Sequence, residues 1–363
     1  MTKATNVPDV PTILLEMENV SKTFSKTGGF FNRLKGTVKA VDEVSFKLFR
    51  GETLGLVGET GSGKSTLGRL ALRLLTPDNG KIVFAGMETT KLSQRRVRQL
   101  RRKAQMVFQD PYGSLDPRKK VSSIVAEPMV VHGLWNKDGR DRVAELISQV
   151  GLQPEHLDRY PHEFSGGQRQ RIGIARAMAL KPELLVLDEP VSALDVSIQA
   201  QIINLLRDLQ RQQTLTFLFI AHDLAVVRHV SDRVAVMYLG RIVEIGPRDA
   251  LYSEPKHPYT VSLLSAVPVP DPELERKRSR VMLHGEIGSA TEMPTGCRFH
   301  PRCYKARITA ARSDVATVAD KNGERLPRDC VEHSPELEGD GGHMAACHFS
   351  ETGNRADTVA FCS

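Results

Sequence analysis

The sequence predicts an α/β fold, and three kinds of segment support this prediction. Short, uninterrupted apolar runs occur at Thr53–Val57, Leu184–Leu187 and Thr216–Ala221, as expected for strands buried on both faces of a parallel sheet. Segments with helical spacing, Lys64–Leu75 and Ile198–Gln212, alternate with these runs. A glycine-rich turn joins the first run directly to the first helix. Alternation of this kind predicts a sheet covered by crossover helices.

The segments on either side of this core predict further strands. Leu14–Val20 and Ala40–Leu48 have strand character and flank a polar insertion at Ser25–Thr37. Arg233–Tyr238 and Arg241–Glu244 predict a late hairpin around a Leu-Gly turn. Amphipathic helices are predicted at 140–150 and 168–180, and the second ends where Lys181-Pro182 cannot continue it.

A change of composition near residue 255 predicts a domain boundary. Beyond Pro247, prolines, charges and cysteines replace the strand–helix alternation. We therefore expect one α/β domain at 12–255 and a small cysteine-containing extension at 256–363. Within the extension, 268–280 has the composition of a linker and 334–345 that of a loose polar loop.

Composition and charge narrow the classes of function only slightly. The 363 residues are 40% hydrophobic and 26% charged with a net charge of +7, and the pI is near 9.2. No apolar run reaches the ~18–20 residues that span a bilayer, and the first residues lack an export signal. We therefore expect any membrane role to be peripheral. The basic run Arg95–Lys103 has helical spacing and predicts a solvated face, although nucleic acid and anionic lipid remain alternative causes of the charge.

A phosphate-binding loop is the strongest chemical signal. Glycines let backbone N–H groups converge on an anion, and the following helix points its positive end there. Lys64 is expected to reach the β and γ phosphates and Ser65 to supply its hydroxyl to Mg²⁺, with Thr66 as a neighbour of less defined role. The predicted ATP-binding residues of this loop are Gly58, Glu59, Thr60, Gly61, Ser62, Gly63, Lys64, Ser65 and Thr66.

Two carboxylates form the second half of the predicted nucleotide site. Asp188 and Glu189 follow the apolar run Leu184–Leu187, at the strand end where parallel α/β folds bind ligands. We expect Asp188 to hold the Mg²⁺ shell and Glu189 to polarise the attacking water. Without the phosphate loop, two acids after a strand would more often form a solvated turn.

The tetrapeptide Ser165, Gly166, Gly167 and Gln168 opens a helix and forms a second anion cradle. One nucleotide does not need two cradles from one chain. In its context, Phe-Ser-Gly-Gly-Gln-Arg-Gln-Arg, the segment resembles the signature sequence of ABC ATPases. That resemblance implies a P-loop NTPase of the ABC type, with a mixed sheet core and a helical signature subdomain.

Other family elements then fall in order. Gln109 resembles the Q-loop residue that contacts Mg²⁺ or water, and His222 resembles the switch histidine that touches the γ-phosphate. Phe24 resembles the aromatic side chain that stacks on adenine, although it could equally belong to the core. The segment that resembles the D-loop is Ser192, Ala193, Leu194 and Asp195.

The resemblance also implies a mechanism and a set of partners. Two cassettes pair head to tail, so that each ATP, with its Mg²⁺, lies between one phosphate loop and the other chain's signature. Asp110–Pro117, Tyr160–Glu163 and His257–Thr260 are similar to the dipeptide and oligopeptide importer branch. Members of that branch combine two homologous but different ATPase subunits, two transmembrane permeases and an extracytoplasmic solute-binding protein. This implies a peripheral location at the cytoplasmic face of the inner membrane.

All five cysteines lie in the last fifth of the chain. Cys297, Cys303, Cys330 and Cys347 could supply four thiolates to an iron–sulfur cluster or to zinc, but no CxxC pair is present. Spacing alone leaves reduced, buried thiols as the alternative. The Gly-Cys-x-Phe-x-x-Arg-Cys arrangement resembles importer tails that carry a [4Fe–4S] cluster. The long gap after Cys303 departs from that pattern and puts Cys330 in doubt, and Cys362 is expected to be free.

Two rival functions remain open. The first is a soluble ABC-type ATPase acting on nucleic acid or ribosomes, which the basic pI favours. The sequence lacks the long coiled-coil insertion or second cassette usual in such proteins, so we expect nucleic acid not to be a partner. The second makes the cysteine tail a redox or iron sensor and the ATPase secondary.

Overall fold

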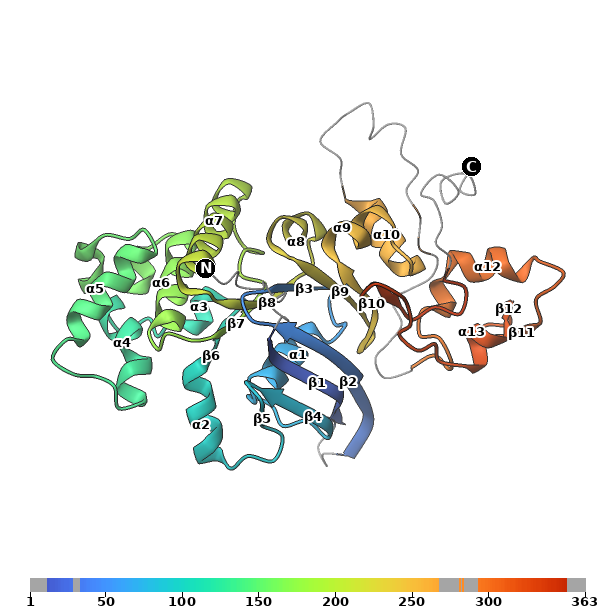
Figure 1. Cartoon of the computed structure of the whole chain (residues 1–363), viewed down its shortest axis with the longest axis horizontal. Coiled ribbons are helices and arrows are strands. Elements are labelled where there is room, and N and C mark those ends of the chain that lie inside the picture. The colour runs from blue at the N-terminus through green and yellow to red at the C-terminus, as the bar shows by residue number, and fades with distance from the viewer. Residues whose placement is uncertain (1–11, 29–32, 268–280, 282, 284–292, 351–363) are drawn as a thin grey trace, which may run out of the picture.

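A seven-stranded mixed sheet forms the centre of the molecule in the computed structural model, which describes residues 12–28, 33–267, 281, 283 and 293–350 (Figure 1). Its strand order is β13-β10-β9-β3-β8-β7-β6. The strands from β9 to β6 run parallel, whereas β10 runs antiparallel to both of its neighbours, β9 and β13. This confirms the predicted mixed sheet. The strands are β3 Thr53–Val57, β6 Ala104–Val107, β7 Leu184–Asp188, β8 Thr216–Ala221, β9 Arg233–Tyr238, β10 Arg241–Pro247 and β13 Met344–Ala345.

Both faces of this sheet are covered, which explains the uninterrupted apolar runs of its strands. Every residue of β3, β7 and β8 is buried. Successive residues point to opposite faces, so Leu185 and Leu187 join one core cluster, whereas Leu184 and Val186 join the other. The covering helices are α1 Lys64–Ala71, α7 Val196–Gln213, α8 Leu224–Val230, α9 Arg248–Ser253 and α10 Pro258–Ala266.

A second, antiparallel sheet lies on one side of the central sheet (Figure 1) and has the order β2-β1-β4-β5. Its first two strands are longer than the sequence predicts. The polar insertion expected at Ser25–Thr37 continues both strands as far as the described chain extends, with Ser25 opposite Thr37. The sequence of this segment lacks the apolar alternation that reveals a strand. The strands are β1 Ile13–Gly28, β2 Arg33–Phe49, β4 Asn79–Phe84 and β5 Met87–Glu88.

A helical subdomain lies at one end of the molecule and the C-terminal extension at the other (Figure 1). In the subdomain, α4 packs against both α5 and α6. The basic run forms α2, in which only Val97 and Leu100 are buried, as expected of a solvated face. The helices of the subdomain are α3 Pro111–Ser114, α4 Val121–Val131, α5 Gly139–Gln149 and α6 Gly166–Met178, and α2 Gln94–Lys103 lies below β6, apart from them (Figure 1).

The extension is joined to the central sheet by hydrogen bonds. The segment 334–345, predicted to be a loose polar loop, instead supplies β13, which pairs with β10 at the sheet edge. The remaining elements are α12 Tyr304–Ala310, β11 Thr317–Ala319, β12 Arg325–Pro327 and α13 Arg328–Glu332. The predicted linker at 268–280 and Cys362 lie outside the described residues.

A buried carboxylate strengthens this junction. Glu244 of β10 is fully buried and accepts hydrogen bonds from the backbone N–H groups of Lys256 and His257, at 2.8 and 2.9 Å. The ring Nε2 of His343 lies 2.8 Å from the same carboxylate. Burial lowers the pKa of His257 to about 4, although Glu244 opposes the shift. Hydrogen bonds from the extension therefore satisfy a buried carboxylate that lies on the other side of the predicted boundary.

Candidate functional site

The phosphate loop, residues 58–65, connects β3 to α1. Gly58, Gly61 and Gly63 have φ values of 155°, 82° and 107°, a region that L side chains rarely adopt. A Cβ on Gly58 would lie 2.1 Å from the carbonyl oxygen of Met237, and one on Gly63 would lie 2.0 Å from that of Ala40. Glycine is required because the neighbouring backbone passes so close.

The side chain of Lys64 is buried beneath this loop. Its Nζ donates to the carbonyl oxygens of Gly58 and Glu59 at 2.7 and 2.9 Å. Burial lowers the lysine pKa, and the carboxylates of Glu189, Asp188 and Glu59 partly offset the effect. The ammonium group is thus placed where the glycine turn and the acidic strand end meet.

Ser65 and Asp188 lie side by side, although 123 residues separate them. The serine hydroxyl donates to Asp188 Oδ1 at 2.8 Å. Burial raises the aspartate pKa, whereas the bond from Ser65 lowers it. The pair forms because β7 and β3 belong to one parallel sheet and end at the same edge. Two oxygen donors in contact are the kind of ligand set that Mg²⁺ takes.

Glu189 is the point at which three separate loops converge. Gln109 Nε2 donates to Glu189 Oε2 at 2.9 Å, and His222 Nδ1 lies 3.3 Å from the same oxygen. The backbone of Glu189 has φ 45°, an unusual conformation for a residue with a side chain. Its N–H is fixed by the carbonyl oxygen of Ile220 at 2.9 Å. The strand end therefore holds this carboxylate in one orientation.

The signature and D-loop segments share a different, exposed surface. Ser165 is the N-cap of α6: its Oγ accepts from the Gln168 N–H at 3.3 Å, and Gln168 Oε1 accepts from the Ser165 N–H at 3.0 Å. A Cβ on Gly166 would lie 3.3 Å from the Leu194 side chain, so the two segments are adjacent. Ser165, Ser192, Ala193 and Asp195 are exposed, whereas Gly167 is buried against the start of α7.

The remaining predicted residues occupy distinct positions. Phe24 is 39% exposed, which excludes the core alternative for this side chain, and the Lys22 ammonium lies 5.8 Å from its ring centroid. Thr60 is exposed at the loop tip, and Thr66 is half-buried in α1. Ser62 is buried, and its carbonyl oxygen accepts from the Gly240 N–H at 2.8 Å.

Two residues of the extension contact the phosphate loop, and sequence reasoning missed both. The Tyr259 hydroxyl accepts from the Glu59 N–H at 2.9 Å. Arg302 Nη1 donates to both carboxylate oxygens of Glu59, at 2.9 and 3.2 Å. Tyr259 lies in the motif that indicates the peptide-importer branch, and Arg302 lies between two of the cysteines. Neither pattern predicts a contact with Glu59, which is 243 residues from Arg302 in the sequence.

The four described cysteines of the extension line one small cavity, together with His300. Burial raises the pKa of Cys297 and of Cys303 to about 12, and it also raises that of Cys330 and Cys347. No group of three or more His, Cys, Asp or Glu within the described ranges is arranged so that it could hold a metal ion. The fold therefore gathers the thiols without placing them in a ligand geometry.

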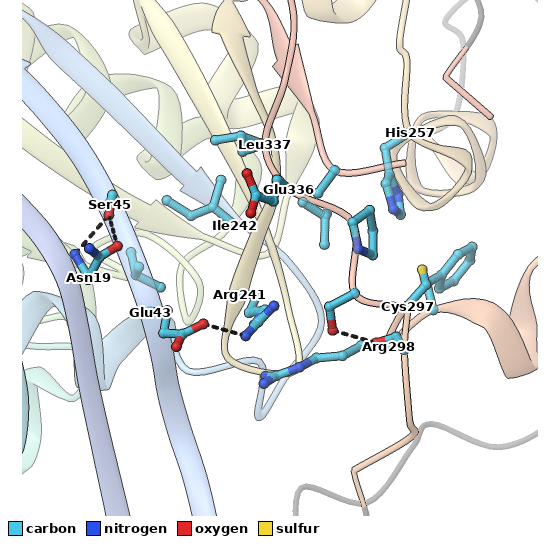
Figure 2. Close-up of a pocket in the computed structure, with 17 residues that line it drawn as sticks. Asn19, Glu43, Ser45, Arg241, Ile242, His257, Cys297, Arg298, Glu336 and Leu337 are labelled. Carbon is cyan, nitrogen blue, oxygen red and sulfur yellow. Dashed lines mark hydrogen bonds and ion pairs between the residues drawn. The ribbon is translucent and has the colours of Figure 1, made fainter. Parts of the chain in front are cut away.

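A larger cavity of about 470 Å³ lies between the antiparallel sheet and the extension (Figure 2). On one wall, Arg241 Nη2 donates to the Glu43 carboxylate at 2.6 Å. The opposite side includes Cys297 and Arg298, and Arg298 is ion-paired with Asp42 of β2. The junction between the two domains is thus lined by paired charges.

The phosphate loop, with its Ser65 hydroxyl, lies at the carboxyl edge of the sheet beside the carboxylates of Asp188 and Glu189. This combination of residues is that of an ATPase of the phosphate-loop class. Comparison with family models matches residues 41–192 to the ABC transporter family and residues 243–309 to the C-terminal region of oligopeptide/dipeptide transporters. The chain belongs to this ABC transporter family, in its oligopeptide/dipeptide branch, and its enzymatic activity is ATP hydrolysis.

Curated relatives and solved structures agree with this assignment. The oligopeptide transport ATP-binding protein AppF of Bacillus subtilis is 50% identical over 93% of this chain and 97% of its own length. OppF of Haemophilus influenzae, with the same description, is 47% identical over 85% and 95%. The dimeric cassette MJ0796 bound to ADP and phosphate superposes with a TM-score of 0.58 at 26% identity, over 65% of this chain and 99% of the cassette.

The relatives also bear on the rival functions. Those described here are transport subunits, so the alternative of a nucleic-acid or ribosome ATPase finds no support. No helix among the described residues is long and apolar enough to cross a bilayer. The chain is therefore an ATP-hydrolysing transporter subunit.

Proposed function

We propose that this chain is one ATPase subunit of an importer of oligopeptides or dipeptides, in which ATP binding and hydrolysis drive transport through separate membrane subunits. AppF and OppF, which match nearly their whole lengths, are described as oligopeptide transport proteins. The extension matches the C-terminal region of oligopeptide/dipeptide transporters. The substrate class is inferred from these relatives.

Residues 58–65 bind the phosphates of ATP in this proposal. A Cβ on Gly61 would meet no atom within 4 Å, so the turn is open at this point before the start of α1, and Lys64 moves from the loop carbonyls to the β and γ phosphates. Ser65, Asp188 and Gln109 hold Mg²⁺, which when bound neutralises charge between the phosphates. The contact between Ser65 and Asp188 is the observation that fits these donors to the metal.

Glu189 acts as the general base, and this assignment is the centre of the proposal. Its carboxylate is the point where Gln109 and His222 converge. A water held against Glu189 loses its proton to the carboxylate as it attacks the γ-phosphate, while His222 contacts that phosphate. The strained backbone at Glu189 fixes the direction of the base before substrate arrives.

The signature acts on the nucleotide of a second chain. Ser165 is exposed, and its neighbour across the surface is the D-loop. Val196, just after the D-loop, is 81% exposed, which suits a surface covered by another subunit. We propose a homologous but different ATPase as the partner, paired head to tail.

The helical subdomain contacts the membrane partners. Its α4 end exposes a cluster of apolar side chains, and Phe108 beside Gln109 is 38% exposed. A patch of this kind marks a protein interface. We propose two transmembrane permeases as the occupants, with an extracytoplasmic binding protein in the same complex and this chain peripheral at the cytoplasmic face of the inner membrane. The cluster comprises Val130, Val131, Leu134 and Trp135.

The cysteines of the extension are proposed as the ligands of a [4Fe–4S] cluster, with zinc and reduced thiols as the other outcomes. All four line one cavity, and four thiolates are the donor set of such a cluster. The missing ligand geometry and the high thiol pKa values require the thiols to move and ionise on loading. Visible absorbance of anaerobically purified protein, with iron, sulfide and zinc analysis, decides among these outcomes.

Uptake by the assembled complex tests the transport function. A strain or vesicle containing this chain, its partner ATPase, both permeases and the binding protein should take up labelled oligopeptide only when ATP is present. Glu189→Gln in this chain should stop uptake while the complex still assembles. Uptake that continues unchanged without ATP, or without this chain, would contradict the proposal.

A further inference from the structure

We propose that Arg302 and Tyr259 of the extension are positioning residues for the phosphate loop: they neutralise and anchor Glu59, a carboxylate that the loop itself carries. The inference rests on the proposal that residues 58–65 bind phosphate. It gives the extension a direct part in nucleotide affinity, separate from any metal that its cysteines hold.

Glu59 creates an electrostatic problem for a phosphate-binding loop. It directly follows Gly58, and its carbonyl oxygen accepts from Lys64 Nζ at 2.9 Å, so it belongs to the loop that is to receive a polyanion. Its side chain is 20% exposed, and solvent screens the carboxylate only in part. An unpaired negative charge here would repel the phosphates of ATP.

Arg302 removes this charge. Its Nη1 donates to both oxygens of the Glu59 carboxylate, at 2.9 and 3.2 Å, and the arginine side chain is only 9% exposed. The Tyr238 hydroxyl lies against the same guanidinium and supports its position. Because arginine stays protonated in proteins, the loop presents a neutral pair instead of a carboxylate.

Tyr259 fixes the backbone of the same residue. Its hydroxyl accepts from the Glu59 N–H at 2.9 Å, so that N–H points to the extension while the glycines and Lys64 face the phosphate position. The Tyr259 ring is fully buried and packs against Tyr238 and Phe299, with ring centroids 4.7 and 5.4 Å apart. Phe299 and Arg302 lie in the segment between Cys297 and Cys303, so this segment determines where the arginine lies.

The experiment measures the affinity of the full-length chain for ATP with Mg²⁺ by titration calorimetry. Arg302→Met should weaken ATP binding about tenfold, which is the effect expected of one unpaired carboxylate at a partly buried position in the loop. ADP, which carries less charge, should lose less. Glu59→Gln combined with Arg302→Met should restore ATP affinity to within about twofold of the unaltered chain. This rescue separates charge neutralisation from a merely structural role.

Arg298→Met is the matched control. Arg298 comes from the same segment and forms a comparably buried ion pair with the cassette, but its partner is Asp42 of β2. It should leave ATP affinity unchanged in protein that melts cooperatively. The inference is overturned if Arg302→Met binds ATP normally, if the double variant stays as weak as the single one, or if Arg298→Met is equally weak.

Lys64→Ala distinguishes failure of this inference from failure of the proposed function. It should weaken ATP binding strongly, because it removes the cation that reaches the phosphates. If it does so while Arg302→Met has no effect, only the role of Arg302 is wrong. If Lys64→Ala binds ATP normally, residues 58–65 are not the phosphate site and both proposals fail.

Discussion

The predicted nucleotide-binding residues form two halves, the phosphate loop with its carboxylates and the signature segment. The two halves differ in which residues their polar groups contact. In the phosphate-loop half, the side chains of Ser65 and Glu189 contact residues from distant parts of the same chain. In the signature half, the described bonds of the Ser165 side chain and N–H go to Gln168, within its own helix cap. One half is assembled inside a single chain, whereas the other faces outward. This difference predicts that substitutions in the two halves will fail in different assays.

The largest effect is expected for Glu189→Gln in the assembled half. The variant keeps the shape of the side chain but cannot accept the proton of the attacking water, so hydrolysis should fall at least ~100-fold. ATP binding should be retained. Single-turnover hydrolysis and calorimetric binding of the same sample check both parts. Turnover at the original rate would show that Glu189 is not the base.

Ser165→Arg tests the outward-facing half and should lower hydrolysis by the assembled complex roughly tenfold or more, since the new side chain occupies the surface where the partner's phosphates would lie. ATP affinity of the isolated chain should not change. Ser165→Ala is the comparison without added bulk, because it removes the hydroxyl and the cap, at about 1 kcal/mol of stability. Weakened ATP binding by isolated Ser165→Arg would contradict the division into halves.

Phe24→Ala should have a smaller effect on affinity. The ring is exposed and available to stack on a base, and an aromatic stack contributes about 1 kcal/mol, or roughly fivefold in affinity. Loss of affinity for ATP but not for inorganic triphosphate, measured by competition, would assign the contact to adenine. Equal loss for both would show that Phe24 acts elsewhere.

Asp188→Asn should change stability and hydrolysis in opposite directions. Burial raises the pKa of Asp188 in the folded chain, so its contribution to stability is fully present below the unfolded pKa and is lost as the pH rises through the folded pKa. At neutral pH the ionised carboxylate therefore costs stability. Without Mg²⁺, the variant should be more stable by about 1 kcal/mol in denaturant titrations at pH 7, and the difference should shrink on acidification. Mg²⁺-dependent hydrolysis should be lost.

The phosphate-loop half could be predicted from the sequence because regular rules of sheet structure determine where its residues lie. The buried strands form apolar runs because both faces are covered, and parallel strands end at one edge, where Ser65 and Asp188, both predicted to bind Mg²⁺, lie together. The contact between Gln109 and Glu189 depended on the family resemblance. The residue roles remain predictions until they are tested by substitution.

The sequence did not predict strands and contacts that have no local sequence pattern. The sequence on either side of residues 29–32 is mostly polar, and no apolar alternation distinguished these strands from an insertion. Strand β13 has two residues, too few for any period to appear. The pairing of Arg302 with Glu59 depends on how the extension folds back, and a single arginine in a basic chain gives no indication of its partner.

The buried carboxylate of Glu244 has a consequence for any attempt to divide this protein. A chain shortened at residue 255 would lose the donors at 256, 257 and 343 together with β13, and β10 would become an uncovered edge of the sheet. The ATPase domain thus depends on the extension for part of its structure. Chimaeras that exchange tails between relatives should be cut upstream of β10, so that this acid travels with its donors.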